Sequence, residues 1–421
     1  MLRGGSVNTF KVLSLEGIKP DTICSCFYVK GMELKPVINR IIGAICKAQK
    51  ISRYKLNHEI IAQLGCERST IEKFVYKKDY FPVYLLNILI EKLPGYKREE
   101  YCAAIQKETE LFKFGKSENW AKFPKRLNHE LAWLSGAIAA DGWITKKEFG
   151  KERMGIVDQN KCALGMAGRY FEDVFGIETS LKKHRTQDCW ILIIDCKAVT
   201  RFFVAFLGFG YGPKARTISE PVIIKKSHYR LDFAKGVMLF DGSVELDGTV
   251  SIGAQSKKLI DDLYDIFKEY GFEFSYSRPN SETFYIRSPY LSECQDSKKW
   301  ISLFGIDTTK GNRLNFLING LGRKPNSEEE VIGALERFVR KRAISKVSIS
   351  DVFNFAKAKK IFTKHQMMDE FKISYSTFWK YALVLRRAKI VARDKKAGRG
   401  IASYYIFNPN INEWNAPIMV S

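Results

Sequence analysis

Two stretches of this sequence end a run of small and apolar residues with an aspartate–glycine pair. Residues 134–143 read LSGAIAADGW and residues 233–243 read FAKGVMLFDGS, which places Asp141 and Asp241 at matching positions. Two carboxylates held close together repel each other, and a divalent cation relieves that repulsion. Mg²⁺ suits such a site because it binds carboxylate, water and phosphate oxygens together. Metals held in this way promote phosphodiester hydrolysis, so Asp141 and Asp241 are our candidate catalytic and metal-binding residues.

Small residues recur every four positions in and before the first stretch, at Ala132, Gly136 and Ala140. On a helix this spacing forms one smooth stripe, and such a stripe lets a second helix approach closely. We therefore expect the two helices to pack against each other as the interface between two halves. Their C-terminal ends would then bring Asp141 and Asp241 side by side.

The sequence after each stretch repeats one order of expected elements. Strands GIVDQ and WILIIDCK and a helix over 161–177 follow the first stretch. Strands TVSIGAQ and TFYIRSP and a helix over 256–272 follow the second. An internal repeat of this kind predicts a unit of helices and strands that occurs twice between residues 125 and 310.

This organisation resembles the single-chain LAGLIDADG homing endonucleases over nearly all of residues 125–310. The second stretch has the family's Phe-x-x-Gly start and Asp-Gly-Ser end. The first stretch matches the family motif at Leu134, Gly136, Ile138, Ala140, Asp141 and Gly142. Phe240 stands where the family usually has a small residue, so we expect the second helix to pack less closely.

The resemblance implies an α+β fold in which two pseudo-symmetric αββαββα units, over 125–225 and 226–315, form a β-saddle on duplex DNA. It implies site-specific cleavage of both strands with Mg²⁺, for which Mn²⁺ could substitute. Supporting catalytic residues implied by the family pattern are Gln159 or Asn160, Gln255, Lys197 and, at a poorer match, Lys298. Basic residues that would reach DNA, or equally could be ordinary surface charge, are Lys146, Lys147, Lys182, Lys183 and Arg185.

Residues 51–93 alternate short amphipathic helices with turns, as in HEIIAQLGC (58–66) and ERSTIEKFVYKK (67–78). This pattern resembles the Cro/repressor-type helix-turn-helix within an all-α domain over 1–95, followed by a linker over 96–124. The recognition helix would run from Ser69 to Lys78, and a helical bundle with a solvated polar face is the alternative. Residues that would face the DNA are Arg68, Ser69, Thr70, Lys73 and Lys77.

Residues 345–410 read as a helix over 363–371, a helix over 375–391 and a basic hairpin that returns as an aromatic strand. This order resembles a winged-helix domain, which we place within 330–421, and a protein-binding module is the alternative. Its candidate contacts to phosphates or the minor groove are Lys380, Arg386, Arg387, Lys395, Lys396 and Arg399.

Composition supports a nucleic-acid partner. The chain has 69 Lys and Arg residues against 46 Asp and Glu residues, for a net charge of +23, which favours binding to a polyanion. The nine cysteines are scattered, so neither a disulfide framework nor a zinc site is expected. We find no secretory leader and no membrane-spanning run, and expect an intracellular protein, in the cytoplasm with the nucleoid.

The leading hypothesis is therefore a monomeric endonuclease that cuts double-stranded DNA, without an obligate protein partner. Two alternatives remain open. One is a DNA-binding regulator that has the same fold without cleavage, and the other is a maturase that assists folding of an intron RNA.

Overall fold

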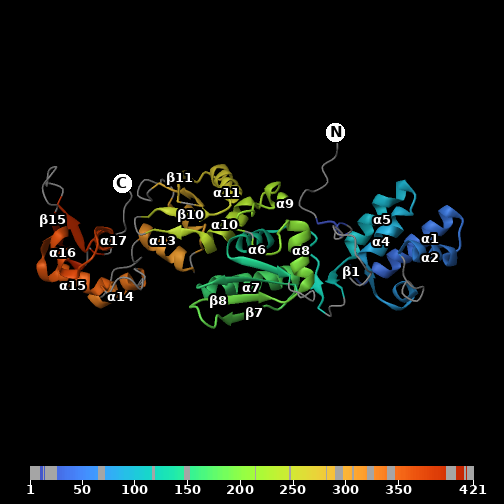
Figure 1. Cartoon of the computed structure of the whole chain (residues 1–421), viewed down its shortest axis with the longest axis horizontal. Coiled ribbons are helices and arrows are strands. Elements are labelled where there is room, and N and C mark those ends of the chain that lie inside the picture. The colour runs from blue at the N-terminus through green and yellow to red at the C-terminus, as the bar shows by residue number, and fades with distance from the viewer. Residues whose placement is uncertain are drawn as a thin grey trace. The chain divides into compact units, whose positions relative to one another are not determined.

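The computed structural model describes residues 10–12, 14, 26–64, 72–115, 119–146, 152–213, 215–245, 248–280, 282–289, 297–305, 308–319, 327–338, 347–394, 404–411 and 414. The chain divides into two compact units, and its helices and strands are labelled in chain order in Figure 1. The first contains residues 1–241 and 254–266, and the second contains residues 242–253 and 267–421. Among the described residues, no helix is long and apolar enough to cross a membrane.

The N-terminal part of the first unit mixes helices with a sheet. Its helical elements are α1 (Leu34–Gln49), α2 (Arg53–Leu64), the π-helical turn η3 (Lys73–Lys77), α4 (Val83–Glu91) and α5 (Gly95–Glu108). Its strands are β1 (Phe27–Lys30), β2 (Tyr80–Pro82), β3 (Leu111–Phe114) and β4 (Ala121–Lys122), in the order β2-β1-β3-β4. The expectation of an all-α domain was wrong, because β1 pairs with β3 from the stretch taken as a linker.

One face of this N-terminal sheet packs on the first repeat. Phe112 of β3 lies 6.1 Å from the ring of Phe202, which belongs to helix α8 (Lys197–Leu207). Phe10 lies 4.9 Å from Phe202 and is only 1% exposed. The Gln106 amide holds this segment, donating to the Phe10 carbonyl and accepting from the Val12 N–H, both at 2.8 Å. The N-terminal part is therefore joined to α8 by a shared aromatic core.

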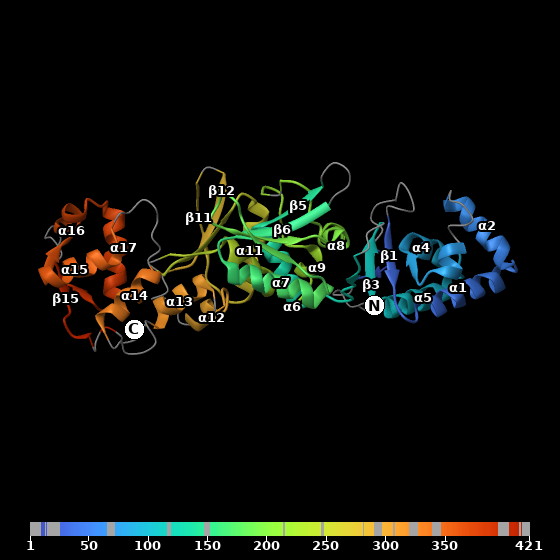
Figure 2. The same ribbon diagram turned by 90° about the horizontal axis from the view of Figure 1, so that it is seen from below.

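The first repeat has the order that the sequence predicts. Helix α6 (His129–Ala140) is followed by β5 (Gly142–Lys146), β6 (Glu152–Asp158), α7 (Lys161–Phe175), β7 (Ser180–Lys183), β8 (Trp190–Ile194) and α8. The strands form an antiparallel sheet in the order β5-β6-β8-β7. Helices α6 and α7 lie on one side of this sheet (Figure 2), where Ile144, Ile156 and Leu192 are buried against them.

The rest of the first unit contains α9 (Val222–Lys225), α10 (Arg230–Asp241) and most of α11 (Lys257–Glu269). Two ion pairs of buried carboxylates tie these elements together: Glu220 with Arg230 at 2.8 Å, and Asp262 with Lys225 at 2.8 Å. Burial raises the pKa of Glu220, and its hydrogen bonds from Arg230 act in the opposite direction. Each buried carboxylate has a cationic partner, so the two pairs hold α9, α10 and α11 together, and removal of either partner would leave a buried charge unpaired.

The second unit begins with the sheet of the second repeat. Its strands are β9 (Ser243–Val244), β10 (Val250–Ala254), β11 (Ser275–Asn280) and β12 (Thr283–Arg287), in the order β11-β12-β10-β9. Helices α12 (Ser297–Ile301) and α13 (Thr309–Asn319) follow. Along the chain, α10, β9, β10, α11, β11 and β12 thus repeat the order of the first repeat.

The C-terminal part of the second unit combines helices with a small sheet. Its elements are α14 (Glu328–Phe338), α15 (Ile349–Lys359), β13 (Ile361–Thr363), α16 (Lys364–Phe371), α17 (Tyr375–Arg387), β14 (Val391–Arg393) and β15 (Tyr404–Phe407). The strands are ordered β13-β15-β14. Ser348 and Thr363 begin α15 and α16 with capping boxes, which satisfy the first N–H groups of each helix.

Candidate active site

Helices α6 and α10 cross backbone to backbone at two glycines. A Cβ atom on Gly136 would lie 2.0 Å from the carbonyl oxygen of Phe233 in α10. Reciprocally, a Cβ atom on Gly236 would lie 2.1 Å from the carbonyl oxygen of Trp133 in α6. Neither position can accept even a methyl group without moving a helix. The predicted close packing of the two motif helices is thereby confirmed.

The crossing gives the two aspartates equivalent places. Each glycine contacts the residue three positions before the other glycine, and each aspartate follows its own glycine by five positions. At 1.5 Å per residue, each lies about 7–8 Å along its helix from the crossing. Asp141 is the C-terminal cap of α6 and half-buried, and Asp241 is the last residue of α10 and exposed.

The expectation that Phe240 loosens the second helix was wrong. Phe240 is 5% exposed, and its ring meets that of Trp133 edge to face at 5.8 Å. The aromatic side chain therefore packs beside the crossing rather than between the backbones. The close contact at Gly236 is retained because the bulk lies elsewhere.

The glycine after Asp141 has a steric role. A Cβ atom on Gly142 would lie 2.5 Å from the Cα of Ile138 and 2.7 Å from its carbonyl oxygen. The chain can therefore turn directly from α6 into β5 only without a side chain at this position. The Val157 N–H also donates to the Asp141 carbonyl at 3.3 Å. These contacts fix the Asp141 backbone against strand β6.

Gln159 and Gln255 occupy the same position in the two repeats. Each is the first residue after a strand, β6 or β10, and each is exposed. The next residue caps a helix in both cases. Asn160 Oδ1 accepts from the N–H groups of Cys162 and Ala163 at 3.1 and 3.3 Å, and Ser256 Oγ accepts from Leu259 at 3.3 Å. The repeat therefore pairs Gln159 with Gln255 and gives Asn160 a capping role.

Lys197 lies toward the other end of the first sheet. Lys197 begins α8 three residues after Ile194, which pairs with Met154 near the start of β6. The Asp141 backbone instead bonds to Val157, near the end of β6. The Lys197 ammonium stands 5.0 Å above the ring of Phe114 in β3. Lys298 falls in α12 of the second unit, and its side chain lies outside the described residues.

The groups of this site that could bind a metal ion are the carboxylates of Asp141 and Asp241. Among the described residues, no group of three or more His, Cys, Asp or Glu side chains is arranged to hold a metal ion. Mg²⁺ does not require such a cage, since it usually keeps several waters and binds one or two carboxylates together with substrate phosphates. Asp141 and Asp241 could therefore each offer one carboxylate to a divalent cation whose remaining ligands come from outside the chain.

Residues 128–204 match a family of domains described as LAGLIDADG-like. This part of the chain is similar to LAGLIDADG-like domains. The match covers α6 to α8, the first repeat and about a fifth of the chain. No curated protein sequence matches this chain.

The chain is also similar to solved structures of homing endonucleases. I-DmoI in complex with DNA and Mn is 12% identical with a TM-score of 0.31, over 38% of this chain and 89% of that chain. I-DmoI with DNA and Ca is 12% identical with a TM-score of 0.33, over 42% and 92%. I-WcaI bound to its DNA recognition sequence is 16% identical with a TM-score of 0.31, over 42% and 80%.

The basic residues expected to reach DNA are spread over several elements. In the LAGLIDADG-like domain, Lys146 ends β5, Lys182 and Lys183 lie on the edge strand β7, and Arg185 follows it, all exposed. Lys73 and Lys77 are exposed on η3, Lys380 is exposed on α17 and Arg386 is half-buried there. Outside the described residues are Arg68, Ser69, Thr70, Lys147, Lys395, Lys396, Arg399 and the side chain of Arg387.

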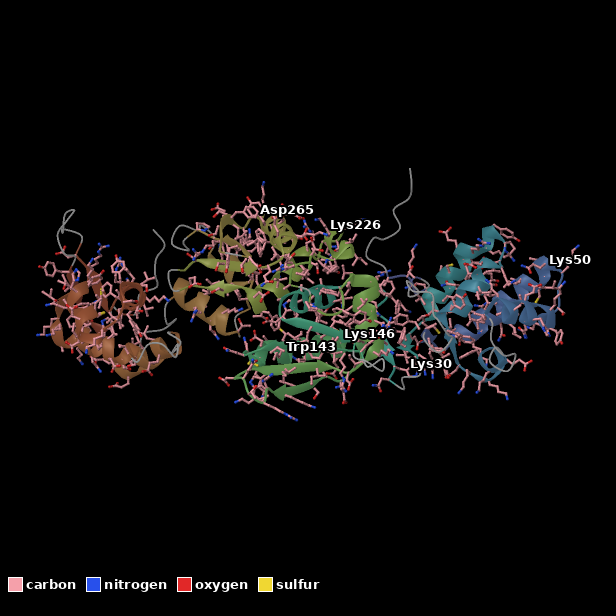
Figure 3. The ribbon with its side chains drawn as sticks, in the orientation of Figure 1. Lys30, Lys50, Trp143, Lys146, Lys226 and Asp265 are labelled. Carbon is pink, nitrogen blue, oxygen red and sulfur yellow. The ribbon has the colours of Figure 1, made fainter. Side chains whose placement is uncertain are left out.

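The sequence interpretation missed Trp143 in the LAGLIDADG-like domain. It lies near the start of β5, and Lys146 ends the same strand (Figure 3). A Cβ atom on Gly155 would lie 2.6 Å from the Trp143 ring, so the indole lies across the glycine of the neighbouring strand. The signal was available in the alternation of β5, where Trp143 falls on the face opposite Ile144.

Proposed function

We propose that the protein is a site-specific endonuclease of the LAGLIDADG homing type, which cuts double-stranded DNA by metal-dependent phosphodiester hydrolysis. The observation that carries this proposal is the reciprocal contact of Gly136 and Gly236, which gives Asp141 and Asp241 equivalent places beyond one helix crossing. The LAGLIDADG-like domain over 128–204 supports it. If the helix crossing only held the two halves together, it would need the two glycines but not a carboxylate at the end of each helix.

In this proposal Asp141 and Asp241 hold divalent cations, Mg²⁺ or Mn²⁺, together with oxygens of the DNA backbone. The bound metal supplies activation of a water molecule and stabilisation of the leaving oxygen. Gln159 and Gln255 orient the attacking waters by hydrogen bonds, one in each half. Their exposure and their matching positions in the repeats support this assignment. Each half acts on one strand, so a single chain suffices as a monomer.

The parts outside the repeats would extend the contact with DNA. The C-terminal order α15, β13, α16, α17, β14, β15 supports the proposal of a winged helix, in which Lys380 on α17 would contact a phosphate. In the N-terminal part, Lys73 and Lys77 of η3 are exposed cations within the proposed helix-turn-helix. We assign these lysines contacts to the DNA backbone, because contacts to phosphates position a protein on DNA without reading its sequence.

Cleavage of random or host DNA libraries by the purified protein with Mg²⁺ or Mn²⁺ tests the proposal. We expect double-strand breaks at a restricted set of sites. Asp141→Asn and Asp241→Asn should each abolish double-strand breaks while binding persists, since Asn keeps the size of the side chain but removes its charge. Tight binding without cleavage under all metal conditions would contradict the enzyme proposal.

That contradicting result would support a second candidate, a DNA-binding regulator without cleavage activity. The C-terminal order of elements favours this candidate, because a nuclease built on the two repeats does not require a further DNA-reading part. Protection of specific sites without strand scission, unchanged in Asp141→Asn, is the result that the regulator predicts.

A further inference from the structure

The sheet of the first repeat has one buried face and one half-exposed face. Ile144, Met154 and Ile156 are at most 2% exposed and face the helices. The alternate positions of the same strands point the other way, away from α6 and α7 (Figure 2). On this open face lie Trp143, Val157, Ile191 and Ile193, all half-buried. We call these four residues the apolar strip.

Strand register makes the apolar strip continuous. Trp143 is opposite Gly155, and Gly155 is opposite Ile193. In the next row Val157 is opposite Ile191. The indole of Trp143 fills the space that a side chain at Gly155 would occupy. The strip therefore crosses β5, β6 and β8 without a polar side chain between its members.

Cations border the apolar strip. Lys182 continues the second row, because it is opposite Ile191, and it is exposed. Arg185 is exposed two residues after the end of β7. Arg153 lies on the same face at the far end, paired with Asp195 at 3.0 Å. An apolar surface edged by cations fits a polyanion that also presents apolar groups.

The major groove of duplex DNA has that chemistry. Its walls carry phosphates, and the thymine C5-methyl is the apolar group that its base edges present. Aliphatic side chains can bury this methyl, but they cannot satisfy the hydrogen-bonding groups of guanine or cytosine. A guanine or cytosine placed against Ile191 and Ile193 would have hydrogen-bonding groups without partners, which is unfavourable.

The open face of the second-repeat sheet differs in chemistry. Positions alternating with buried Val250, Ile252 and Ile286 carry mainly hydroxyl groups and one guanidinium. They include Ser251, Ser275, Ser277, Thr283, Tyr285 and Arg287. Such side chains read bases by hydrogen bonds and do not depend on a methyl group.

We propose that the first repeat reads a thymine-rich half-site through methyl contacts with the apolar strip, whereas the second repeat reads its half-site through hydrogen bonds. This inference rests on the proposed action on DNA and adds the composition of its target. The target is then asymmetric in chemistry as well as in sequence, with thymine methyl groups required in one half only.

The test uses the full chain carrying Asp141→Asn and Asp241→Asn, so that binding is measured without cleavage. Sites are selected from a random duplex library, and each thymine is then replaced singly by deoxyuridine, which pairs identically but lacks the methyl group. We expect about fourfold weaker binding for each contacted methyl removed, as the burial of one methyl group predicts. These losses should fall in one half of the site.

A matched pair of variants assigns the effect to the apolar strip. Ile191→Ser with Ile193→Ser removes the aliphatic surface of two of the four strip residues, so it should reduce the preference for thymine over uracil sites. Ser251→Ala with Ser277→Ala, on the other sheet, should retain the thymine preference.

Equal binding of thymine and uracil sites by the parent chain would overturn this inference. If the unsubstituted protein still cleaved those sites, the proposed function would stand. If the strip variants instead lowered the molar mass measured by light scattering, the strip would be a protein interface and the inference would again fall. A chain that bound no DNA would remove both proposals.

Discussion

At the residue scale, the glycines at the helix crossing set how closely α6 and α10 can approach. Gly136→Ala places a methyl 2.0 Å from a carbonyl oxygen, so the helices must separate. We expect a loss of at least about 1–3 kcal/mol, typical of an overpacked core, measured by thermal or denaturant unfolding. Gly165→Ala in α7 is the matched control, since nothing lies within 4 Å of its Cβ position, and it should gain up to about 1 kcal/mol. Equal effects at the two sites would contradict the close crossing.

Gln159 and Asn160 are neighbours for which we expect separable roles. Asn160→Ala removes the cap of α7 and should cost about 1 kcal/mol of unfolding free energy, with cleavage retained. Gln159→Ala should leave stability unchanged and slow cleavage of one strand by about 10- to 100-fold, the range seen for residues that orient the groups around a metal site. Strand-specific nicking assays on both variants measure this. Loss of cleavage in Asn160→Ala at full stability would reverse the assignment.

Lys197 and Gln159 are both candidate catalytic residues of the first repeat, so their effects on cleavage can be compared. The Lys197 ammonium lies over Phe114 in the N-terminal sheet. We expect Lys197→Met to slow cleavage less than Gln159→Ala, as measured in the same nicking assay. A larger effect for Lys197→Met would show that the lysine leaves this ring when DNA binds.

The positions of Asp141 and Asp241 at the ends of α6 and α10 were predictable from sequence, because an Asp-Gly that twice ends a run of small and apolar residues is a local pattern. The sequence did not decide which of Gln159 and Asn160 is the catalytic candidate, since this depends on where β6 ends and on which residue caps α7. Phe240 was misjudged for a related reason. Its residue type is visible in the sequence, but its direction toward Trp133 is set by the crossing.

At the element scale, a buried ion pair joins β6 to α8. Glu152 and Arg201 side chains are 1% and 15% exposed, and the Tyr211 hydroxyl donates to Glu152 at 3.0 Å. Burial raises the pKa of Tyr211, with the Glu152 charge acting in the same direction. Glu152→Ala should cost about 3–5 kcal/mol, because it leaves Arg201 without its partner. Denaturant unfolding measures the loss.

The ion pair made by the next residue of β6, Arg153 with Asp195, provides the control for that prediction. Arg153 and Asp195 are 44% and 65% exposed, so Arg153→Ala should cost less than about 1 kcal/mol. Similar costs for Glu152→Ala and Arg153→Ala would show that burial does not distinguish the two pairs.

The elements of the repeats were predictable because hydrophobic periodicity is local, and α7, β6, β8 and β10 fall where it places them. The N-terminal sheet was not predictable in this way. Its central pairing joins Phe27 with Phe114, and no local pattern encodes a partner so distant in sequence. Strands of three or four residues such as β1 and β2 also carry too few positions to show alternation.

At the scale of the whole molecule, the packing within each unit decides which regions can be removed. Deleting residues 1–95 would take β1 and β2 from the N-terminal sheet and leave β3 paired with the two-residue strand β4 alone. It would also remove Phe10 from its place beside Phe202. Such a deletion tests folding rather than DNA binding, so a loss of activity would not locate a DNA-binding surface.

Truncation after Asn319 is the more informative experiment, because it removes α14 to α17 together with the sheet β13-β15-β14 and leaves both repeats in the chain. The net charge of +23 makes salt dependence the appropriate measurement. For every phosphate that the truncated chain no longer neutralises, the slope of log Kobs against log salt should fall by about 0.9. We expect a shallower slope and weaker binding, with the cleavage position unchanged because Asp141 and Asp241 remain. An unchanged slope would contradict a DNA-binding role for the C-terminal part, and a shifted cleavage position would show that this part helps to select the site.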